Sequence, residues 1–379
     1  MFGQKEIDFL NALDIVAFND ALRQNESIFE RRKERFLPFY RVLSFYYDNL
    51  PKVEVENRLK LFTTKELVDL TLRFYKQLSP ETYKRAKNTM FGKVREVILH
   101  PTRDFPHFDI DKERGKQLGN HRNSCGFKDG KKYIELEPES RLSGYVRTAH
   151  ELGHACTQYN FTEKDWYKEF LLSEIDSRFA ELLITNYLHS IGEISNRDAI
   201  DITNYFIAEQ REKLGYCLCE ANVMNALMQI QEGRDVTKAD LENIFHTMGG
   251  PVVESMKKLS QTERKLGQRR GGDFEHELQY VIGTIVATSM LGDYLDDKKY
   301  MKWYDKKFLD TIDKLTLEEG IVLIGNRDMA IEKIKALPQE EKQELFGKTM
   351  NDMLAEHLAF SEDNNQRAKQ LDAQNEREK

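Results

Sequence analysis

Residues 147–160 read RTAHELGHACTQYN, and within this stretch two histidines flank a glutamate with the spacing H-E-x-x-H. On a helix, His150 and His154 lie one turn apart and project from the same face, so both imidazole rings can reach one metal ion. Glu151 lies about 100° around the helix from His150, beside that ion, where its carboxylate can accept a proton from water. The stretch therefore predicts a helix that carries a catalytic metal site.

A catalytic zinc ion usually takes three protein ligands and keeps one position open, so a third ligand must come from elsewhere. Thr157 and Asn160 stand where one large group of zinc proteases has H-x-x-G-x-x-H, which excludes that group. The next strongly helical segment, DWYKEFLLSEIDSRFAELLITNYL, offers Glu174, with Glu181 on the same face two turns later. The competing carboxylates are Glu163, Asp165, Glu169 and Asp176.

The composition favours a mainly α fold. The 379 residues are 40% hydrophobic and 32% charged with only eight prolines, and most long stretches have the periodicity of amphipathic helices. The best β candidate is NSCGFKDGKKYIELEP, in which two short strand-like runs flank Asp129-Gly130. This pattern is typical of a β-hairpin, so we expect a small hairpin or sheet beside the helix of residues 147–160.

Breaks in these patterns divide the chain into four expected regions. Residues 1–88 form a helical N-terminal region, and residues 89–195 contain the hairpin and the H-E-x-x-H helix. Residues 196–360 form a helical C-terminal region. Residues 361–379 contain almost no apolar side chains, so we expect either a polar helical extension or a frayed tail.

Charge and hydropathy limit the classes of partner. The net charge of −7 provides no basic field for nucleic acid or an anionic membrane, so peptides or small molecules are the expected partners. The chain starts without a signal-peptide pattern and has no run of 18 apolar residues. The four cysteines lack the number and spacing of a disulfide scaffold. These features predict a cytoplasmic protein with reduced thiols, and secretion by a route without a cleavable signal is the alternative.

The motifs together resemble a known family. GYVRTAHELGHACTQY followed by SEIDSRFAE is similar to the zinc oligopeptidases of the thimet oligopeptidase and oligoendopeptidase F family. In that family, H-E-x-G-H precedes an E-x-x-S-x-x-x-E helix whose first glutamate is the third zinc ligand. These positions are His150, Glu151, His154 and Glu174 here, and Ser177 and Glu181 complete the second motif.

The resemblance implies a zincin-like helical metallopeptidase with Zn²⁺ as its cofactor. It also implies that the hairpin binds substrate, and backbone pairing with the strand near residues 133–135 would make recognition tolerant of sequence. Downstream, GGDFEHELQYVIGTIVATSM resembles the family's tyrosine-rich segment, with Tyr280 and Gly283 fitting Y-x-x-G. His276 and Tyr280 are four residues apart, so they share a helix face, and either could donate a hydrogen bond to the developing oxyanion.

The expected function is a zinc-dependent endopeptidase that cleaves peptides or unfolded or loop segments of proteins, with Glu151 as general base. One alternative is a metalloprotease of the secreted effector or toxin type, specialised for a single protein substrate. A second alternative is a non-catalytic helical binding protein on the same fold. For His276 and Tyr280 the alternative to catalysis is an exposed helix residue and a packed aromatic ring.

Overall fold

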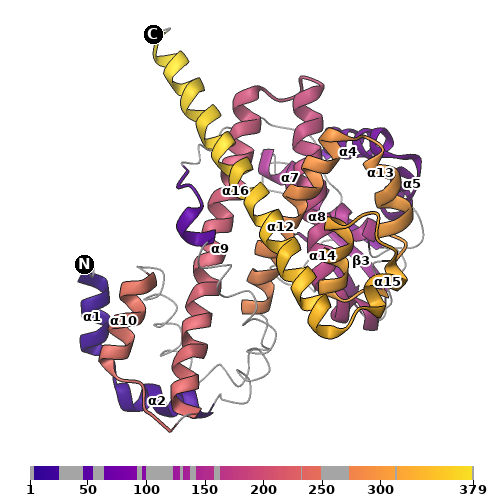
Figure 1. Ribbon diagram of the computed structural model, residues 1–379. Helices are drawn as coiled ribbons and strands as arrows, with labels where there is room; N and C mark the ends of the chain where they lie inside the picture. The colour runs from indigo at the N-terminus through magenta and orange to yellow at the C-terminus, as the bar shows by residue number, and fades with distance from the viewer. Residues whose placement is uncertain are drawn as a thin grey trace. The chain divides into compact units, whose positions relative to one another are not determined.

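The computed structural model describes residues 4–24, 46–53, 64–91, 96–99, 123–128, 131–136, 142–157, 163–231, 233–248, 273–311 and 314–377. Most of this chain is helical, as the sequence predicts (Figure 1). Backbone contacts divide it into unit 1, Met1–Leu50 and Ala208–Val281, and unit 2, Pro51–Ile207 and Ile282–Lys379.

Two long helices, α9 (Asn196–Gln231) and α12 (Asp273–Asp296), each contribute residues to both units. The four ranges expected from the sequence stay a prediction.

Unit 1 contains α1 (Gln4–Ala12), α2 (Ile15–Gln24), α10 (Lys238–Met248) and the adjoining parts of α9 and α12. The buried amide of Asn19 on α2 joins this helix to the segment before α10. Its Nδ2 donates to the carbonyl oxygen of Val236, and its Oδ1 accepts from the Val236 backbone N–H, both at 2.9 Å. These two hydrogen bonds satisfy both backbone polar groups of Val236, a buried residue between two helices.

Unit 2 is built around two helices that are consecutive in the chain, α7 (Leu142–Thr157) and α8 (Glu163–Ser190), which make the most extensive contact in the described structure. The helices α4 (Thr64–Leu78) and α5 (Pro80–Phe91) also contact α7. At the end of α8, Gly192 has φ of 73° and the backbone N–H of Glu193 donates to Leu188 O. This left-handed glycine stops the helix while satisfying its last carbonyls.

Besides its parts of α9 and α12, the described portion of unit 2 contains five further helical elements. These are α13 (Tyr300–Trp303), the π-helix η3 (Tyr304–Phe308), α14 (Leu317–Gly325), α15 (Ile331–Ala336) and α16 (Gln339–Arg377). A capping box starts α14, because the Thr316 side chain accepts from the Glu319 backbone N–H and the Glu319 carboxylate accepts from the Thr316 backbone N–H.

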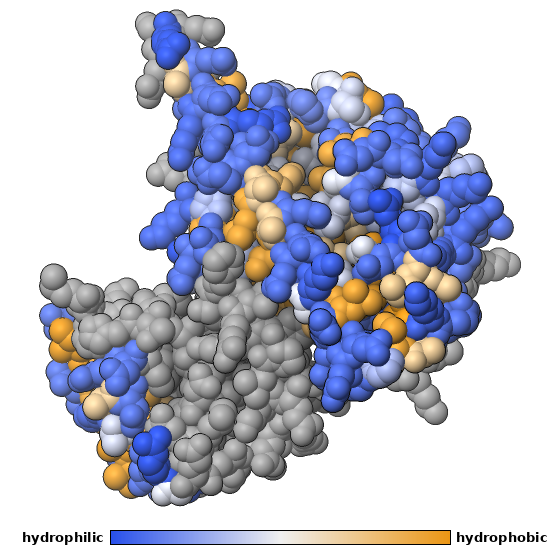
Figure 2. Space-filling view, in the orientation of Figure 1, coloured by the Kyte–Doolittle hydropathy of each residue, from blue (hydrophilic) through white to orange (hydrophobic). Residues whose placement is uncertain are grey.

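The polar residues from 361 onward belong to α16, which continues to Arg377, so the helical extension is the alternative that the structure adopts. A buried hydrogen bond contributes to holding this part of α16: the side chain of Asn364 donates to Asn204 Oδ1 at 2.8 Å. Figure 2 shows a mostly hydrophilic surface over this helix and the described parts of unit 2 in this view. None of the described helices combines the length and apolar character that a membrane span needs.

A small sheet accompanies α7 in unit 2. Its strands are β1 (Glu96–Leu99), β2 (Asn123–Lys128) and β3 (Lys131–Leu136), in the order β1-β3-β2. β2 and β3 pair antiparallel, whereas β1 pairs parallel with β3. The turn expected at Asp129-Gly130 lies outside the described residues, so the hairpin as a whole stays a prediction.

The position of β3 overturns one expectation from the sequence. Tyr133 is opposite Glu96 of β1 and also opposite Gly126 of β2, so both edges of this strand are paired within the protein. The expected backbone pairing of a substrate with residues 133–135 is therefore wrong. A strand accepts an added peptide only along an unpaired edge, and β3 lies at the centre of the sheet.

Candidate metal centre

Helix α7 brings His150 and His154 together. One helical turn separates them, and their Nε2 atoms lie 3.0 Å apart. The two rings meet edge to face, with centroids 4.6 Å apart. Both side chains are buried, so their ring nitrogens face the interior of unit 2 rather than bulk water.

Helix α8 adds Glu174, which is fully buried. Its Oε1 lies 3.3 Å from Nε2 of His154, and its Oε2 lies 3.6 Å from Nε2 of His150. One ligand atom from each of these three residues lies within 4.8 Å of the other two, so the group could hold a metal ion. The Ser177 hydroxyl donates to the backbone oxygen of Glu174 at 3.1 Å and lies 3.4 Å from Oε2.

Glu181, the second carboxylate on the same face of α8, has a different place. Its Oε1 lies 3.0 Å from Nδ1 of His150, the ring nitrogen that does not face Glu174. Its Oε2 accepts a hydrogen bond from Nη1 of Arg178 at 2.8 Å, and both side chains are buried. Such a carboxylate fixes the orientation of a metal-binding imidazole.

Arg178 is the residue of this network that the sequence analysis did not single out. Its spacing to Glu181, three residues along a helix, is a signal for an ion pair, but most such pairs lie on exposed surfaces. Here the pair is buried, and an arginine beside Glu181 balances a carboxylate that would otherwise be costly to remove from water.

The electrostatics of the centre favour a bound cation. Burial by itself would lower the pKa of His150, but the carboxylates of Glu181, Glu174 and Glu151 outweigh it and raise this pKa to about 9. Burial would raise the pKa of Glu174, yet His154, His150 and Arg178 lower it to about 2. The centre without a metal therefore contains an ionised Glu174 next to a protonated His150.

Glu151 follows His150 directly on α7 and is also buried. Burial is the main cause of the raised pKa of its carboxyl group, and the nearby Glu174 and Glu181 raise it further, although His150 and His154 act in the opposite direction. A carboxylate with a raised pKa binds a proton more readily near neutral pH, which suits a general base.

Among the competing carboxylates, Asp176 is buried, and burial is the main cause of its raised pKa. The charge of Asp305 on η3 raises this pKa further, whereas Arg85 on α5 and His150 on α7 lower it. Asp305 accepts a hydrogen bond from the Thr82 hydroxyl in the same buried cluster. The side chains of Glu163, Asp165 and Glu169 lie outside the described residues.

The two expected oxyanion donors lie on α12. Tyr280 and the backbone of His276 belong to unit 1, whereas the group on α7 and α8 belongs to unit 2. The Nζ atom of Lys213 lies 4.0 Å from the centroid of the Tyr280 ring, and the side chain of His276 lies outside the described residues. The catalytic role of both residues stays a prediction.

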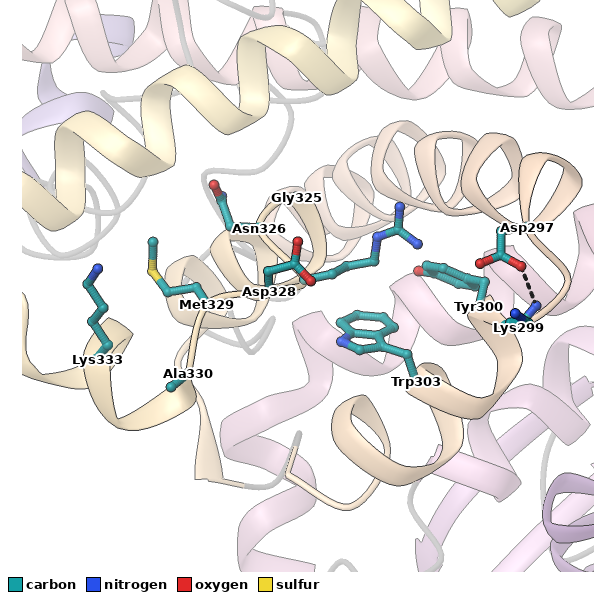
Figure 3. A pocket seen from close by; sticks show the side chains of 11 residues that line it. Asp297, Lys299, Tyr300, Trp303, Gly325, Asn326, Asp328, Met329, Ala330 and Lys333 are labelled. Carbon is teal, nitrogen blue, oxygen red and sulfur yellow. Dashed lines mark hydrogen bonds between the residues drawn. The ribbon is translucent and has the colours of Figure 1, made fainter.

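Unit 2 also has a surface pocket that is separate from the candidate metal centre (Figure 3). Tyr300 and Trp303 line one side and residues 325–330 the other. Lys307 holds the second side by donating from Nζ to the carbonyl oxygens of Arg327 and Met329, at 2.7 and 3.0 Å. None of the residues that line the pocket belongs to the group on α7 and α8.

The comparisons with known proteins concern the fold. No family model matches the sequence, and no curated protein matches it. A crystal structure from Chlamydophila abortus, described as that of a peptidase, matches 91% of this chain with a TM-score of 0.50 and 14% identity. The chain spans 56% of that structure, so it shares the fold of part of a longer protein.

A second structure, described as an oligoendopeptidase F from Bacillus anthracis str. Ames, matches 86% of this chain. The chain spans 56% of it with a TM-score of 0.42 and 14% identity, and a likeness this low adds no argument about the fold.

Proposed function

We propose that this protein is a zinc-dependent endopeptidase that hydrolyses peptide bonds in peptides or in unfolded or loop segments of proteins. The observation that carries the proposal is the buried group of His150, His154 and Glu174, whose ligand atoms lie within 4.8 Å of one another. Its fit to zinc rests on the donor set, because two imidazoles and one carboxylate with a remaining open position are the ligands of many catalytic zinc ions.

A bound zinc ion would supply Lewis-acid chemistry, polarising a scissile carbonyl group and making a water molecule more acidic. The protein's own part begins with Glu151, whose carboxylate accepts the proton of the attacking water. The same carboxyl group then returns this proton to the leaving amine, which its raised pKa favours.

Glu181 and Arg178 act on the geometry rather than on the substrate. Oε1 of Glu181 lies 3.0 Å from Nδ1 of His150, and a proton held on this nitrogen would leave the lone pair of the ring on Nε2, toward His154 and Glu174. Arg178 holds Glu181 in place from the other side. In this proposal either Tyr280 or His276 of α12 donates a hydrogen bond to the developing oxyanion.

The proposal is tested by metal analysis of the purified protein and by digestion of a mixed peptide pool. We expect about one zinc ion per chain and cleavage that a chelator stops and added zinc restores. Zinc with inert peptides but one cleaved protein would instead support a protease specialised for a single substrate. Absence of bound metal after zinc loading would support a non-catalytic binding protein and would overturn the proposal.

Glu151→Gln separates catalysis from metal binding. The amide keeps the size of the side chain but cannot accept the proton, so turnover should fall by about 10²–10⁴-fold while zinc content and melting temperature stay unchanged. Peptide kinetics together with metal analysis measure both effects. Full activity of this variant would remove Glu151 from the mechanism, and loss of zinc would show that it has a structural role.

A further inference from the structure

The part of α8 that carries Glu174 is packed against glycines of three other helices. These are Gly153 on α7, Gly283 on α12 and Gly320 on α14, all in unit 2. A glycine inside a helix lowers helix stability, so three of them against one short stretch require a reason in packing. The packing constraint differs among the three glycines, because a Cβ atom added at each would meet different atoms of α8.

Gly283 touches the backbone of the third candidate ligand itself. A Cβ atom at this position would lie 3.0 Å from the backbone oxygen of Glu174, 3.1 Å from its backbone carbon and 3.3 Å from its Cβ. Contacts this short require the neighbour to move by a few tenths of an ångström. The neighbour is main chain in a helix, so it cannot yield by rotating a side chain.

Gly153 holds the same stretch of α8 from the side of α7. A Cβ atom there would lie 2.8 Å from Cα of Ser177 and 3.2 Å from Cβ of Ala180. The contact of Gly320 is softer, because its Cβ would meet the end of the Leu172 side chain, at 2.5 Å from Cδ2. The main chain of α8 beside Glu174 is thus in direct contact with α7 and with α12.

We propose that Gly283 is a positioning residue for the metal centre: by having no side chain, it lets α12 set the position of Glu174 relative to the two histidines of α7. This inference rests on the proposed role of Glu174 as a metal ligand. Distances from a metal to its ligands are held within about 0.2 Å. A displacement of α8 by a few tenths of an ångström therefore exceeds what the coordination tolerates.

The test compares Gly283→Ala with Gly292→Ala on the full chain. Both positions lie on α12, but a Cβ at Gly292 would meet nothing within 4 Å, so this variant changes helix propensity without a new contact. Gly320→Ala is a second control, in which a flexible side chain can yield. The measurements are the zinc dissociation constant by chelator competition, the visible spectrum with Co²⁺, and the melting temperature without metal.

We expect Gly283→Ala to bind zinc about tenfold more weakly, as changes around metal ligands commonly do, and to alter the Co²⁺ spectrum. The melting temperature without metal should stay close to that of the wild type, because alanine favours the helix and offsets the tighter contact. Both control variants should match the wild type in zinc affinity and Co²⁺ spectrum.

Wild-type zinc affinity and Co²⁺ spectrum in Gly283→Ala would overturn the inference, and a lower melting temperature with both unchanged would assign Gly283 to packing alone. His154→Ala serves as the reference for the proposed function: if it keeps full zinc affinity, the metal site itself is wrong. If Gly283→Ala does not fold, Gly153→Ala tests the same positioning from α7, and unchanged zinc affinity in that variant would overturn the inference.

Discussion

Two buried histidines of unit 2 have opposite acid–base character. His150 on α7 is 7% exposed and has carboxylates around it, and its pKa is raised to about 9. His357 on α16 is 1% exposed, and burial lowers its pKa to about 3. Two hydroxyl groups lie beside the His357 ring: Oγ1 of Thr288 lies 2.8 Å from Nδ1, and Oγ of Ser361 lies 3.4 Å from Nε2.

This difference shows that burial alone does not identify a functional histidine. Hydroxyl groups satisfy a neutral imidazole without any net charge, which is the ordinary condition of a histidine in a protein core. Carboxylates around a buried imidazole instead create a place for positive charge, which a proton or a metal ion can supply. The two sites can be compared directly because both lie in unit 2.

The largest expected difference between the two sites concerns metal binding. Glu174→Ala removes a ligand and should weaken zinc binding by at least about a hundredfold, and the same holds for His150→Ala and His154→Ala. His357→Gln should leave zinc affinity unchanged and lower the free energy of unfolding by about 1–3 kcal/mol, because it disturbs a buried hydrogen-bonded pair. Chelator competition measures the zinc affinity, and urea unfolding measures the free energy of unfolding. If His357→Gln weakened zinc binding as much as Glu174→Ala, the proposed difference between the two histidines would be wrong.

A smaller effect is expected from Glu181, which contacts the candidate metal centre through His150. Glu181→Gln should weaken zinc binding by about 10–100-fold, because the amide no longer favours the correct orientation and protonation of the ring. The matched control is Asp201→Asn, which alters the partly buried ion pair of Asp201 with Arg197, at 2.9 Å on α9. If the two variants weaken zinc binding equally, Glu181 has no specific role at the metal centre.

The pH dependence of the metal-free protein gives the smallest and most direct test. Protonated His150 stabilises the fold below its ordinary pKa of about 6.5, and this stability is lost as the pH rises to about 9. His357 acts in the opposite direction, because the unfolded chain binds the proton first and stability is lost as the pH falls from about 6.5 toward 3.

Urea unfolding over a pH series measures how the free energy of unfolding changes with pH on the acidic and on the alkaline side. His357→Gln should reduce the change on the acidic side. Bound zinc should reduce the change on the alkaline side, because a metal-binding imidazole is already neutral. Zinc affinity should correspondingly increase with pH up to about 9. A pH-independent zinc affinity between pH 6.5 and 9 would contradict the protonated state of His150 in the metal-free centre.

Local spacing explains which parts of the centre the sequence predicts. His150 and His154 are one helical turn apart, and Glu174 lies on the next helix, so the three residues follow from helical geometry and a short connection. Glu181 emerges as an alternative ligand from the same periodicity, but only coordinates show that it faces Nδ1 of His150.

Contacts between distant segments explain what the sequence does not predict. The sequence of neither β1 nor β3 indicates that the two strands pair in parallel. This pairing makes β3 the central strand of the sheet instead of an edge strand. The close approach of Gly283 to Glu174 likewise joins two helices far apart in the chain. The polar end of α16 is ordered by hydrogen bonds such as that between Asn364 and Asn204, which hydropathy does not register.

The groups of the metal centre on α7 and α8 all lie between His150 and Glu181, on two helices that follow each other directly. Closing so short a loop costs little chain entropy, so the ligands can meet early in folding, before the distant α12 docks. If the group binds zinc as proposed, an ion present during refolding would therefore stabilise the pair of α7 and α8 while the remaining chain is still unfolded. The ion would then act first as a nucleus for folding, before any role in catalysis.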